Sequence, residues 1–376
     1  MEPSLSAFID LIRTATASQQ SLQIRGGGSK DFLGQHLPSP QHPPHGRMLD
    51  TRTHSGIVAY EPTELVVTVK AGTPLRELEA TLAAQGQSLP FEPPHFSPHA
   101  TVGGMVASGL NGPARASVGA VRDYVLGLQL LNGRGEHLTF GGQVMKNVAG
   151  YDVSRLMAGA MGTLGLITEV SLKVLPVAPA EATLRFDMTQ ADALAALHRW
   201  GGQPLPLNAS CWVEDEGQAL LFVRLRGAVA AVEAACTRMG GERLDQRQAA
   251  DDWQACREHA LPFFRAPSAD LSLWRLSVPQ TAPMLQIAGL DASLSLVEWQ
   301  GAQRWVWAKA DHAAAIRAAA HAVGGHATLF KPAHEHDRVH GVFTPLTEPL
   351  ASIHRRLKAE FDPAGVFNPG RLYADC

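Results

Sequence analysis

Glycine is concentrated in short clusters within the first 180 residues of this 376-residue chain. The main clusters are Gly26–Gly28, Gly103–Gly104 and the spaced glycines Gly159, Gly162 and Gly165. Glycine tolerates positive φ and lets other groups approach the backbone closely. An isolated Gly-Gly-Gly is most often an ordinary turn, but successive N–H groups in such a turn also bind anions. Several clusters in one region therefore favour a flat or phosphate-bearing ligand held directly against the backbone.

Composition excludes several other classes of protein. The net charge of −3 argues against nucleic acid as the main partner, and 45% hydrophobic residues suffice for sizeable cores. Cys211, Cys236, Cys256 and Cys376 form no C-x-x-C, so we expect no zinc ribbon, iron–sulfur or thioredoxin site. The first residues lack the pattern of a signal peptide, and no apolar run reaches membrane-spanning length. We therefore expect a cytoplasmic protein.

The periodicity of apolar residues predicts an α+β fold, and a change in composition near residue 180 divides it into two parts at Pro176–Pro179. In the first part we expect a strand at 65–70, a helix capped by Thr73, a hairpin at Asn132-Gly133 and a half-buried strand at 166–174. The second part predicts an antiparallel sheet covered by helices. Its predicted helices are 189–200, 228–239, 246–259 and 310–323, and its predicted strands are 209–214, 218–225, 270–278, 294–300 and 304–309.

The first glycine cluster is flanked by charge, since Arg25 precedes it and Lys30 follows shortly after it. This loop satisfies neither the Walker pattern nor a Rossmann G-x-G-x-x-G at a helix start. The second cluster lies in the small-residue stretch 98–109, which is either a tightly packed loop or a ligand-contacting one. The third passes directly into the strand predicted at 166–174.

The order of the segments RGGGSK, ATVGGMVASG, VRDYVLGLQLLNGRGE and GTLGLITEVSLK resembles the FAD domain of the vanillyl-alcohol oxidase/p-cresol methylhydroxylase superfamily. Met145–Asp152 resembles a stretch of its 2-hydroxy-acid oxidoreductases, and Phe361–Arg371 matches its closing segment. The chain most resembles the FAD-binding subunits of bacterial glycolate oxidase (glycolate dehydrogenase). The resemblance is clear over residues 20–178 and 350–373 and loose between them.

The resemblance implies a two-lobed FAD-binding domain at 1–180, split near 98, an α+β cap domain at 181–345, and a segment at 346–376 that returns to the FAD domain. The residues it implies for FAD binding are Arg25, Gly26, Gly27, Gly28, Ser29, Lys30, Thr101, Gly103, Gly104, Ser108, Arg122, Asp123, Gly162, Gly165, Ile167, Asn368 and Arg371. Members that tether FAD covalently often have His where Ser29 stands, so we expect noncovalent FAD.

The resemblance also implies the reaction and the partners. We expect oxidation of a small 2-hydroxy acid, either glycolate or D-lactate, in a complex with a larger FAD-containing subunit and an iron–sulfur subunit. A flavin accepts a hydride and releases electrons singly, and this chain has no cluster-ligand motif of its own. Membrane association would then come only through partner subunits. A stand-alone D-2-hydroxy-acid dehydrogenase and a flavin-loaded structural or electron-relay subunit remain as alternatives.

Two further groups of residues are candidates for chemistry. Arg257 could pair with a carboxylate and His259 could take a hydroxyl proton, although a helix end anchored by aromatic residues explains them more simply. The His-Gly-His motif of the larger subunit and of D-lactate dehydrogenases is absent. The nearest pattern, His334-Glu335-His336, would bind metal only as a strand, and we expect a solvated loop and no metal site.

Overall fold

The computed structural model describes residues 2–35, 46–142, 152–215, 217–290 and 295–373. The chain divides into two compact units. Unit 1 comprises residues 1–110, 120–176 and 345–376, and unit 2 comprises residues 111–119 and 177–344. The sequence prediction assigned 111–119 to the first domain. This short segment belongs to unit 2 because Gly112 O accepts a hydrogen bond from Trp299 Nε1 (3.0 Å) and Ser117 Oγ one from Gln300 Nε2 (2.8 Å).

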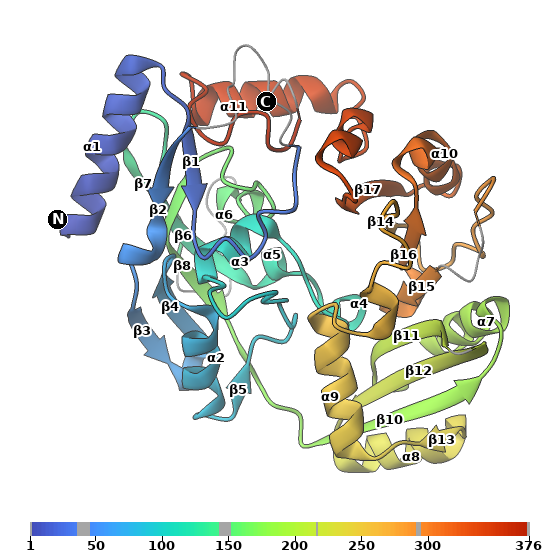
Figure 1. Cartoon of the computed structure of the whole chain (residues 1–376). Helices are drawn as coiled ribbons and strands as arrows, with labels where there is room; N and C mark the ends of the chain where they lie inside the picture. Colours follow the sequence, from blue (N-terminus) through green and yellow to red (C-terminus); the bar gives the residue numbers. More distant parts are fainter. Residues whose placement is uncertain (1, 36–45, 143–151, 216, 291–294, 374–376) are drawn as a thin grey trace. The chain divides into compact units, whose positions relative to one another are not determined.

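Unit 1 is built on a five-stranded antiparallel sheet in the order β3-β4-β8-β6-β7 (Figure 1). Its strands are β3 (Ile57–Glu61), β4 (Val66–Lys70), β6 (Val125–Leu131), β7 (His137–Gly141) and β8 (Leu166–Lys173). Two small two-stranded sheets accompany it. They are the parallel pair β1 (Leu22–Arg25) and β2 (Arg47–Asp50), and the antiparallel pair β5 (Gln87–Ser88) and β9 (Leu175–Pro176).

Strand β8 was predicted to be half-buried, and that prediction is wrong. It occupies the centre of the sheet, and its burial pattern shows that side chains on both of its faces are covered. Ser171, expected on the polar face, is buried and shares a 2.8 Å hydrogen bond with Thr68 on β4. Burial also raises the pKa of Glu169, which accepts a hydrogen bond from Gln129. Two of the polar residues that alternate with apolar ones along β8 therefore do not simply face solvent. They form hydrogen bonds with polar side chains on the neighbouring strands.

The predicted hairpin is confirmed, because β6 and β7 pair antiparallel around Asn132. The Asn132 side-chain oxygen accepts from the backbone N–H groups of Arg134 and Glu136, which closes the turn. Thr73, in contrast, does not cap the following helix. Its hydroxyl contacts Gly56 and Lys70, and Pro74 is the N-cap residue.

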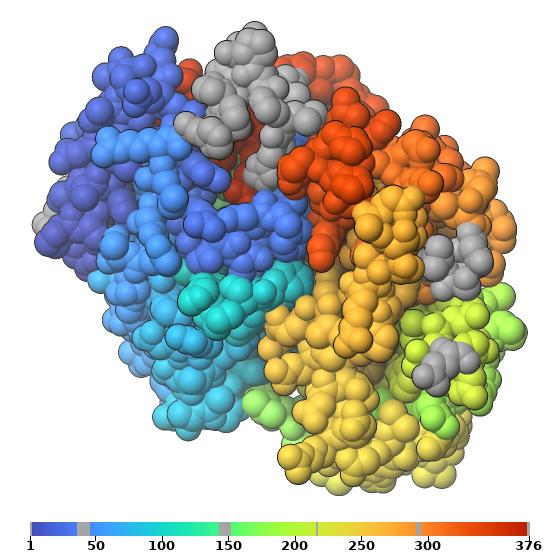
Figure 2. Space-filling model, in the orientation of Figure 1, coloured from blue at the N-terminus to red at the C-terminus, as the bar shows by residue number. Residues whose placement is uncertain are grey.

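The helices of unit 1 are α1 (Pro3–Ser18), α2 (Leu75–Ala83), α3 (Val102–Ser108), α5 (Val121–Tyr124), α6 (Val153–Leu156) and α11 (Leu350–Phe361). Helix α1, dark blue in Figures 1 and 2, is exposed along one side and buries Phe8, Ile9 and Ile12. These side chains pack with Leu22 of β1 and Phe367 near the C-terminus. The two ends of the chain therefore share one core.

Unit 2 contains an eight-stranded antiparallel sheet in the order β13-β10-β12-β11-β15-β16-β14-β17. Its strands are β10 (Ala180–Asp187), β11 (Leu207–Asp215), β12 (Gln218–Gly227), β13 (Glu242–Arg243), β14 (Ser272–Ser277), β15 (Ser295–Glu298), β16 (Gln303–Ala308) and β17 (His326–Lys331). Its helices are α4 (Arg115–Val118), α7 (Gln190–Gly201), α8 (Val229–Met239), α9 (Gln246–Arg257) and α10 (Ala313–Ala322). The predicted antiparallel sheet with covering helices is confirmed.

Short 3₁₀ helices occur in both units. They lie at Thr51–Thr53 and Pro62–Glu64 in unit 1, and at Pro262–Phe264, Trp299–Gly301, Ala310–His312 and Glu335–His340 in unit 2.

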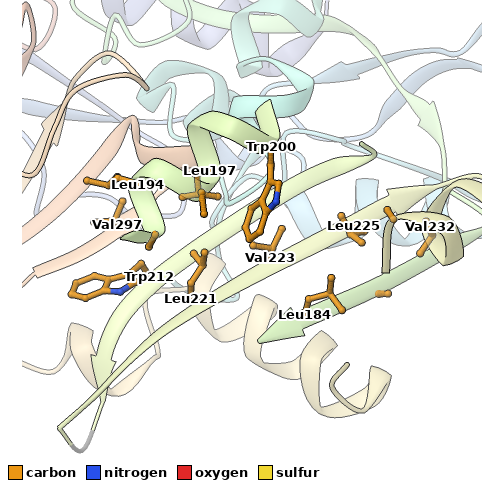
Figure 3. Close-up of a cluster of buried hydrophobic side chains, with 14 residues drawn as sticks. Leu184, Leu194, Leu197, Trp200, Trp212, Leu221, Val223, Leu225, Val232 and Val297 are labelled. Atoms are coloured by element: carbon orange, nitrogen blue, oxygen red, sulfur yellow. The ribbon is translucent and has the colours of Figure 1, made fainter. Parts of the chain in front are cut away.

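One face of this sheet carries the core drawn in Figure 3. Leu194, Leu197 and Trp200 of α7 point from one side of the helix toward the sheet, where Leu221 and Val223 meet them. The spacing of three residues places these side chains on one helical stripe, as an amphipathic helix requires. Across the described residues, no helix is both long and apolar enough to span a bilayer.

Candidate functional site

The glycine clusters of unit 1 line one cavity that encloses about 710 Å³, its open mouth included. The walls come from four parts of the chain. They are the end of β1 with the loop after it, helix α3 with Thr101, the Met161–Ile167 segment that leads into β8, and the C-terminal turn at 368–371, and the single residues Thr51 and Ala71 complete the lining.

The loop after β1 offers unoccupied donors to this cavity. The backbone N–H groups of Gly26, Gly27, Gly28 and Ser29 donate to no group among the residues that the structure describes. These residues are half-buried, and Gly28 has a φ of +72°, the left-handed conformation found in turns whose successive amides converge on an anion. An arrangement of this kind is an anion-binding concavity.

Helix α3 behaves differently, because its first N–H groups are already used. Val102 N donates to Thr73 O (2.9 Å), Gly103 N to Ala71 O (2.7 Å), and Gly104 N to the Thr101 side chain (3.2 Å). Thr101 is thus the N-cap residue of the helix. The small residues of α3 shape the cavity wall, while free amides come from the first loop.

Close packing explains the glycine at position 27. A Cβ added there would overlap the carbonyl oxygen of His99, so any larger residue would push the two glycine-rich segments apart. Gly104 is different, because its added Cβ would meet only Thr101 Oγ1, at 3.1 Å. The first glycine serves the packing of the loops, and the second keeps the cavity open.

The charged residues at the cavity carry a positive excess. Arg25 forms a 2.6 Å ion pair with Asp31, while Lys30 is buried and lies over the Phe96 ring. Arg371 donates weakly to the carbonyls of Lys30 and Leu33, and burial lowers its pKa. The Nε of Arg371 is buried without a hydrogen bond in the described part of the chain. This leaves a donor available to an anionic ligand.

Asn368 holds three segments of the site together. Its side-chain oxygen accepts from Ile24 N (2.9 Å), and its side-chain nitrogen donates to Met161 O (2.7 Å). Its backbone N–H donates to Leu22 O, and its φ of +39° suits asparagine. We infer that Asn368 positions the β1 loop and contributes to the cavity wall.

The cavity brings together all of the predicted FAD-binding residues except Arg122 and Asp123. Those two lie on α5, where the Asp123 carboxylate accepts from Ala120 N and caps the helix locally. The prediction missed wall residues that have no chemical signature in the sequence. They are Ile24, Asp31, Thr51, Ala71, Ala107, Met161 and Leu166. The stretch Met145–Tyr151 lies outside the described residues.

The predicted catalytic pair, Arg257 and His259, belongs to unit 2 and does not line this cavity. The Arg257 guanidinium donates to Glu258 (2.8 Å), while the His259 ring stacks on Phe264 with centroids 4.2 Å apart. Burial lowers the pKa of His259 to about 3, and Arg275 adds to the shift. A base this weak accepts a proton poorly at neutral pH.

Sequence reasoning did not single out Arg275, which lies on β14 of the unit 2 sheet. Its guanidinium lies over the Phe330 ring, and burial lowers its pKa to about 10, with Arg115 nearby. At neutral pH it stays charged, and no acidic partner pairs with it among the described residues. A carboxylate-bearing molecule would supply the missing charge.

The His-rich segment also differs from the strand that a metal site would need. His334 precedes a 3₁₀ helix at Glu335–His340, and its ring stacks on that of His336, 5.2 Å away. Glu335 pairs with Arg338. Throughout the described ranges, no three His, Cys, Asp or Glu side chains group as metal ligands.

Comparison with known proteins places this geometry in a family. Residues 4–141 match the family model described as FAD binding domain. The chain is 45% identical to the glycolate oxidase subunit GlcE of Escherichia coli over 369 residues, which are 98% of this chain and 97% of that protein. The chain belongs to the GlcE family of glycolate oxidase subunits. The prediction of FAD as the cofactor is thereby confirmed.

More distant relatives match only part of the chain. D-lactate dehydrogenase of Anaerostipes hadrus is 36% identical over 35% of this chain and 27% of its own length. The glycolate oxidase subunit GlcD of Bacillus subtilis is 32% identical over 37% of this chain and 29% of its own length. By name, these relatives are a dehydrogenase of D-lactate and a subunit of an oxidase of glycolate, and both of these compounds are 2-hydroxy acids.

The fold itself recurs in a protein of low sequence identity. Alkyldihydroxyacetonephosphate synthase superposes with a TM-score of 0.69 at 16% identity, covering 96% of this chain and 73% of that one. This similarity confirms the predicted α+β architecture, while the FAD-binding role of its first part rests on the family match at residues 4–141.

Proposed function

We propose that this GlcE-family chain is the FAD-binding subunit of a complex that oxidises glycolate to glyoxylate, with D-lactate as a second candidate substrate. The observation that carries the proposal is its 45% identity to a glycolate oxidase subunit across almost the entire length of both chains. The partners would be a larger FAD-containing subunit and an iron–sulfur subunit, and any membrane association of a cytoplasmic complex would come through them.

The residues of the cavity fit FAD. The free amides of Gly26–Ser29 suit the diphosphate, and the positive excess from Arg25, Lys30 and Arg371 balances its charge. When bound, FAD supplies acceptance of a hydride and release of single electrons. Gly104 and Ser108 would leave room for its flat ring system against α3. We expect the attachment to be noncovalent, with Ser29 in the position of a tethering residue.

A stand-alone 2-hydroxy-acid dehydrogenase is the second candidate, and Arg275 is the observation that favours it. An unpaired guanidinium provides the bidentate partner that a substrate carboxylate needs. In the subunit proposal, the same chemistry would be supplied by the larger subunit.

The decisive experiment compares the isolated chain with the reconstituted complex. The absorption spectrum and the acid-released flavin would be recorded first, and glycolate or D-lactate would then be added anaerobically. We expect the isolated chain to retain FAD and to be bleached only in the complex. Rapid bleaching of the isolated chain that is lost in Arg275→Met would support the stand-alone enzyme. A protein that cannot be reconstituted with FAD would refute both candidates.

If bleaching occurs only in the complex, flavin-site variants separate catalysis from electron relay. A Gly104→Val subunit assembled with wild-type partners would lack this flavin. Glyoxylate formation that continues with an artificial acceptor would show that this flavin relays electrons or serves structure.

A further inference from the structure

Arg304 is the charged residue of an otherwise apolar region of the unit 2 sheet. It lies on β16, where its cross-strand neighbours are Val297 on β15 and Leu276 on β14. Val297 belongs to the core shown in Figure 3, and Leu276 belongs to the neighbouring core under α10. Arg304 is only 3% exposed. Its side chain therefore lies between two hydrophobic cores.

The guanidinium of Arg304 is only partly satisfied. Its Nη2 donates to Ala282 O (3.1 Å), but Nε and Nη1 are buried with no hydrogen bond to any residue in the described ranges. Burial lowers the pKa to about 10, so the group remains charged at neutral pH. A buried charge that lacks a counter-ion is costly, and such a group points to a missing partner.

A cavity of about 510 Å³, its open mouth included, adjoins this guanidinium. Besides Arg304, its polar wall includes Gln190 and Ser295, which are joined by a 2.9 Å hydrogen bond. Leu285, Ile287 and Leu290 form an apolar wall. Gln286 also lines the cavity, which thus combines one fixed positive charge, three neutral polar side chains and a hydrocarbon surface.

We propose that this cavity binds a small monocarboxylate with a short hydrocarbon tail. The carboxylate would take the second Nη2 hydrogen and one of the free N–H groups of Arg304, the two-pronged arrangement that guanidinium groups form. The tail would lie against Leu285, Ile287 and Leu290. Inorganic phosphate fits less well, because several of its oxygens would face the apolar wall without donors.

Thermal unfolding of the full chain with butyrate tests the proposal. Butyrate has no 2-hydroxyl group and is not oxidised by the proposed reaction, while 1-butanol matches its tail without the charge. We expect a saturable rise in melting temperature with butyrate, and none with 1-butanol or with phosphate at equal ionic strength. Arg304→Met should weaken butyrate binding roughly 10- to 100-fold.

Two further measurements keep the test decisive. Without ligand, Arg304→Met should melt at the same or a higher temperature, since it removes an unpaired buried charge. Ile287→Trp keeps Arg304 but fills the cavity, and should also abolish the butyrate effect. The proposal is overturned if butyrate has no saturable effect on the wild type, if Arg304→Met retains it, or if phosphate acts equally well.

The test is independent of the proposed function. Arg304 lies in unit 2 and lines a cavity separate from the glycine-lined one, so the Arg304→Met chain should retain FAD. Failure of butyrate binding with FAD retained would leave the proposed function standing. A wild-type chain that binds butyrate but does not retain FAD would refute the proposed function and leave the carboxylate site standing.

Discussion

At the scale of single residues, Gly104 gives the sharpest test of the cofactor site. A Cβ at this position meets only Thr101 Oγ1, at 3.1 Å, so the fold can accept a larger side chain that narrows the cavity. We predict that Gly104→Val abolishes FAD retention while the melting temperature of the flavin-free protein changes little. Acid-released flavin and thermal unfolding measure the two effects.

Gly201→Val is the matched control, because a Cβ at Gly201 would have no neighbour within 4 Å and lies outside the cavity. It should retain FAD fully. Gly27→Val should instead lower both stability and FAD content, since its side chain would strike His99 O. Full FAD retention in Gly104→Val would contradict the assignment of α3 to the cavity wall around the cofactor.

His259 provides a prediction on pH dependence. Its pKa is about 6.5 when exposed in the unfolded chain and about 3 in the folded protein, because burial disfavours the imidazolium. Below pH 6.5 the unfolded state therefore binds a proton that the folded state does not. The contribution of neutral His259 is complete above pH 6.5 and is lost as pH falls toward 3, by at most about 1.4 kcal/mol per pH unit.

The variant His259→Asn should remove this slope. Asparagine tolerates the left-handed backbone at this position, where φ is 53°. Urea unfolding between pH 7 and pH 5 would give the difference in stability between variant and wild type at each pH. As pH falls, the free energy of unfolding of the variant should rise relative to that of the wild type. The exposed His336→Asn is the control and should leave the slope unchanged, and parallel profiles for His259→Asn would refute the buried, neutral imidazole.

At the scale of elements, the sequence predicted most strands and helices, but it did not predict which hydrogen bonds their polar side chains form. The predicted strand 209–214 lies within two residues of each end of β11, although five consecutive residues of β11 are buried and no alternation marks its faces. The role of Asn368 depends on a hydrogen bond to Ile24 across 344 residues, which no local pattern records. Likewise, Thr101 lines the cavity as expected of a residue near a diphosphate, but the sequence did not show that its hydroxyl also caps α3 by accepting from Gly104 N.

Helix α11 yields a prediction about how the C-terminal segment is anchored. Lys358 Nζ donates to Asp362, Thr163 O and Phe367 O at 2.7–2.8 Å. The Asp362 carboxylate, 1% exposed, also accepts from the N–H groups of Val366 and Phe367. Lys358→Met would leave this carboxylate buried without its cation, so we expect a loss of about 3–5 kcal/mol in the free energy of unfolding.

The same helix offers its own control in the exposed pair of Glu348 and Arg355. Arg355→Met should leave stability nearly unchanged, because surface ion pairs contribute little. Urea titration of both variants gives the comparison. Equal stabilities for the two would mean that Asp362 finds another partner and that the Lys358 network is dispensable.

At the scale of the whole molecule, the chain passes from one unit to the other at several points. The change in composition along the sequence indicates only the one near residue 180. The predicted boundary near residue 180 follows a change in residue composition, and the structure places the crossing at 176–177. The brief excursion at 111–119 has no compositional signal, because its attachment rests on a few contacts with Trp299 and Gln300. Long-range contacts, rather than local patterns, decide such boundaries.

The C-terminal segment 345–376, which belongs to unit 1, leads to a prediction about FAD binding. Leu22 N donates to Val366 O (2.7 Å) and Asn368 N donates to Leu22 O (2.9 Å), so the C-terminal segment completes the edge of β1 beside the cofactor loop. A chain truncated after Thr344 should therefore lose FAD retention, although unit 2 is complete in it. Adding residues 345–376 as a separate peptide should restore part of the flavin binding, and a peptide carrying Asn368→Ala should restore less. Flavin content equal to that of the intact protein in the truncated chain would show that the β1 loop is ordered without the C-terminal turn.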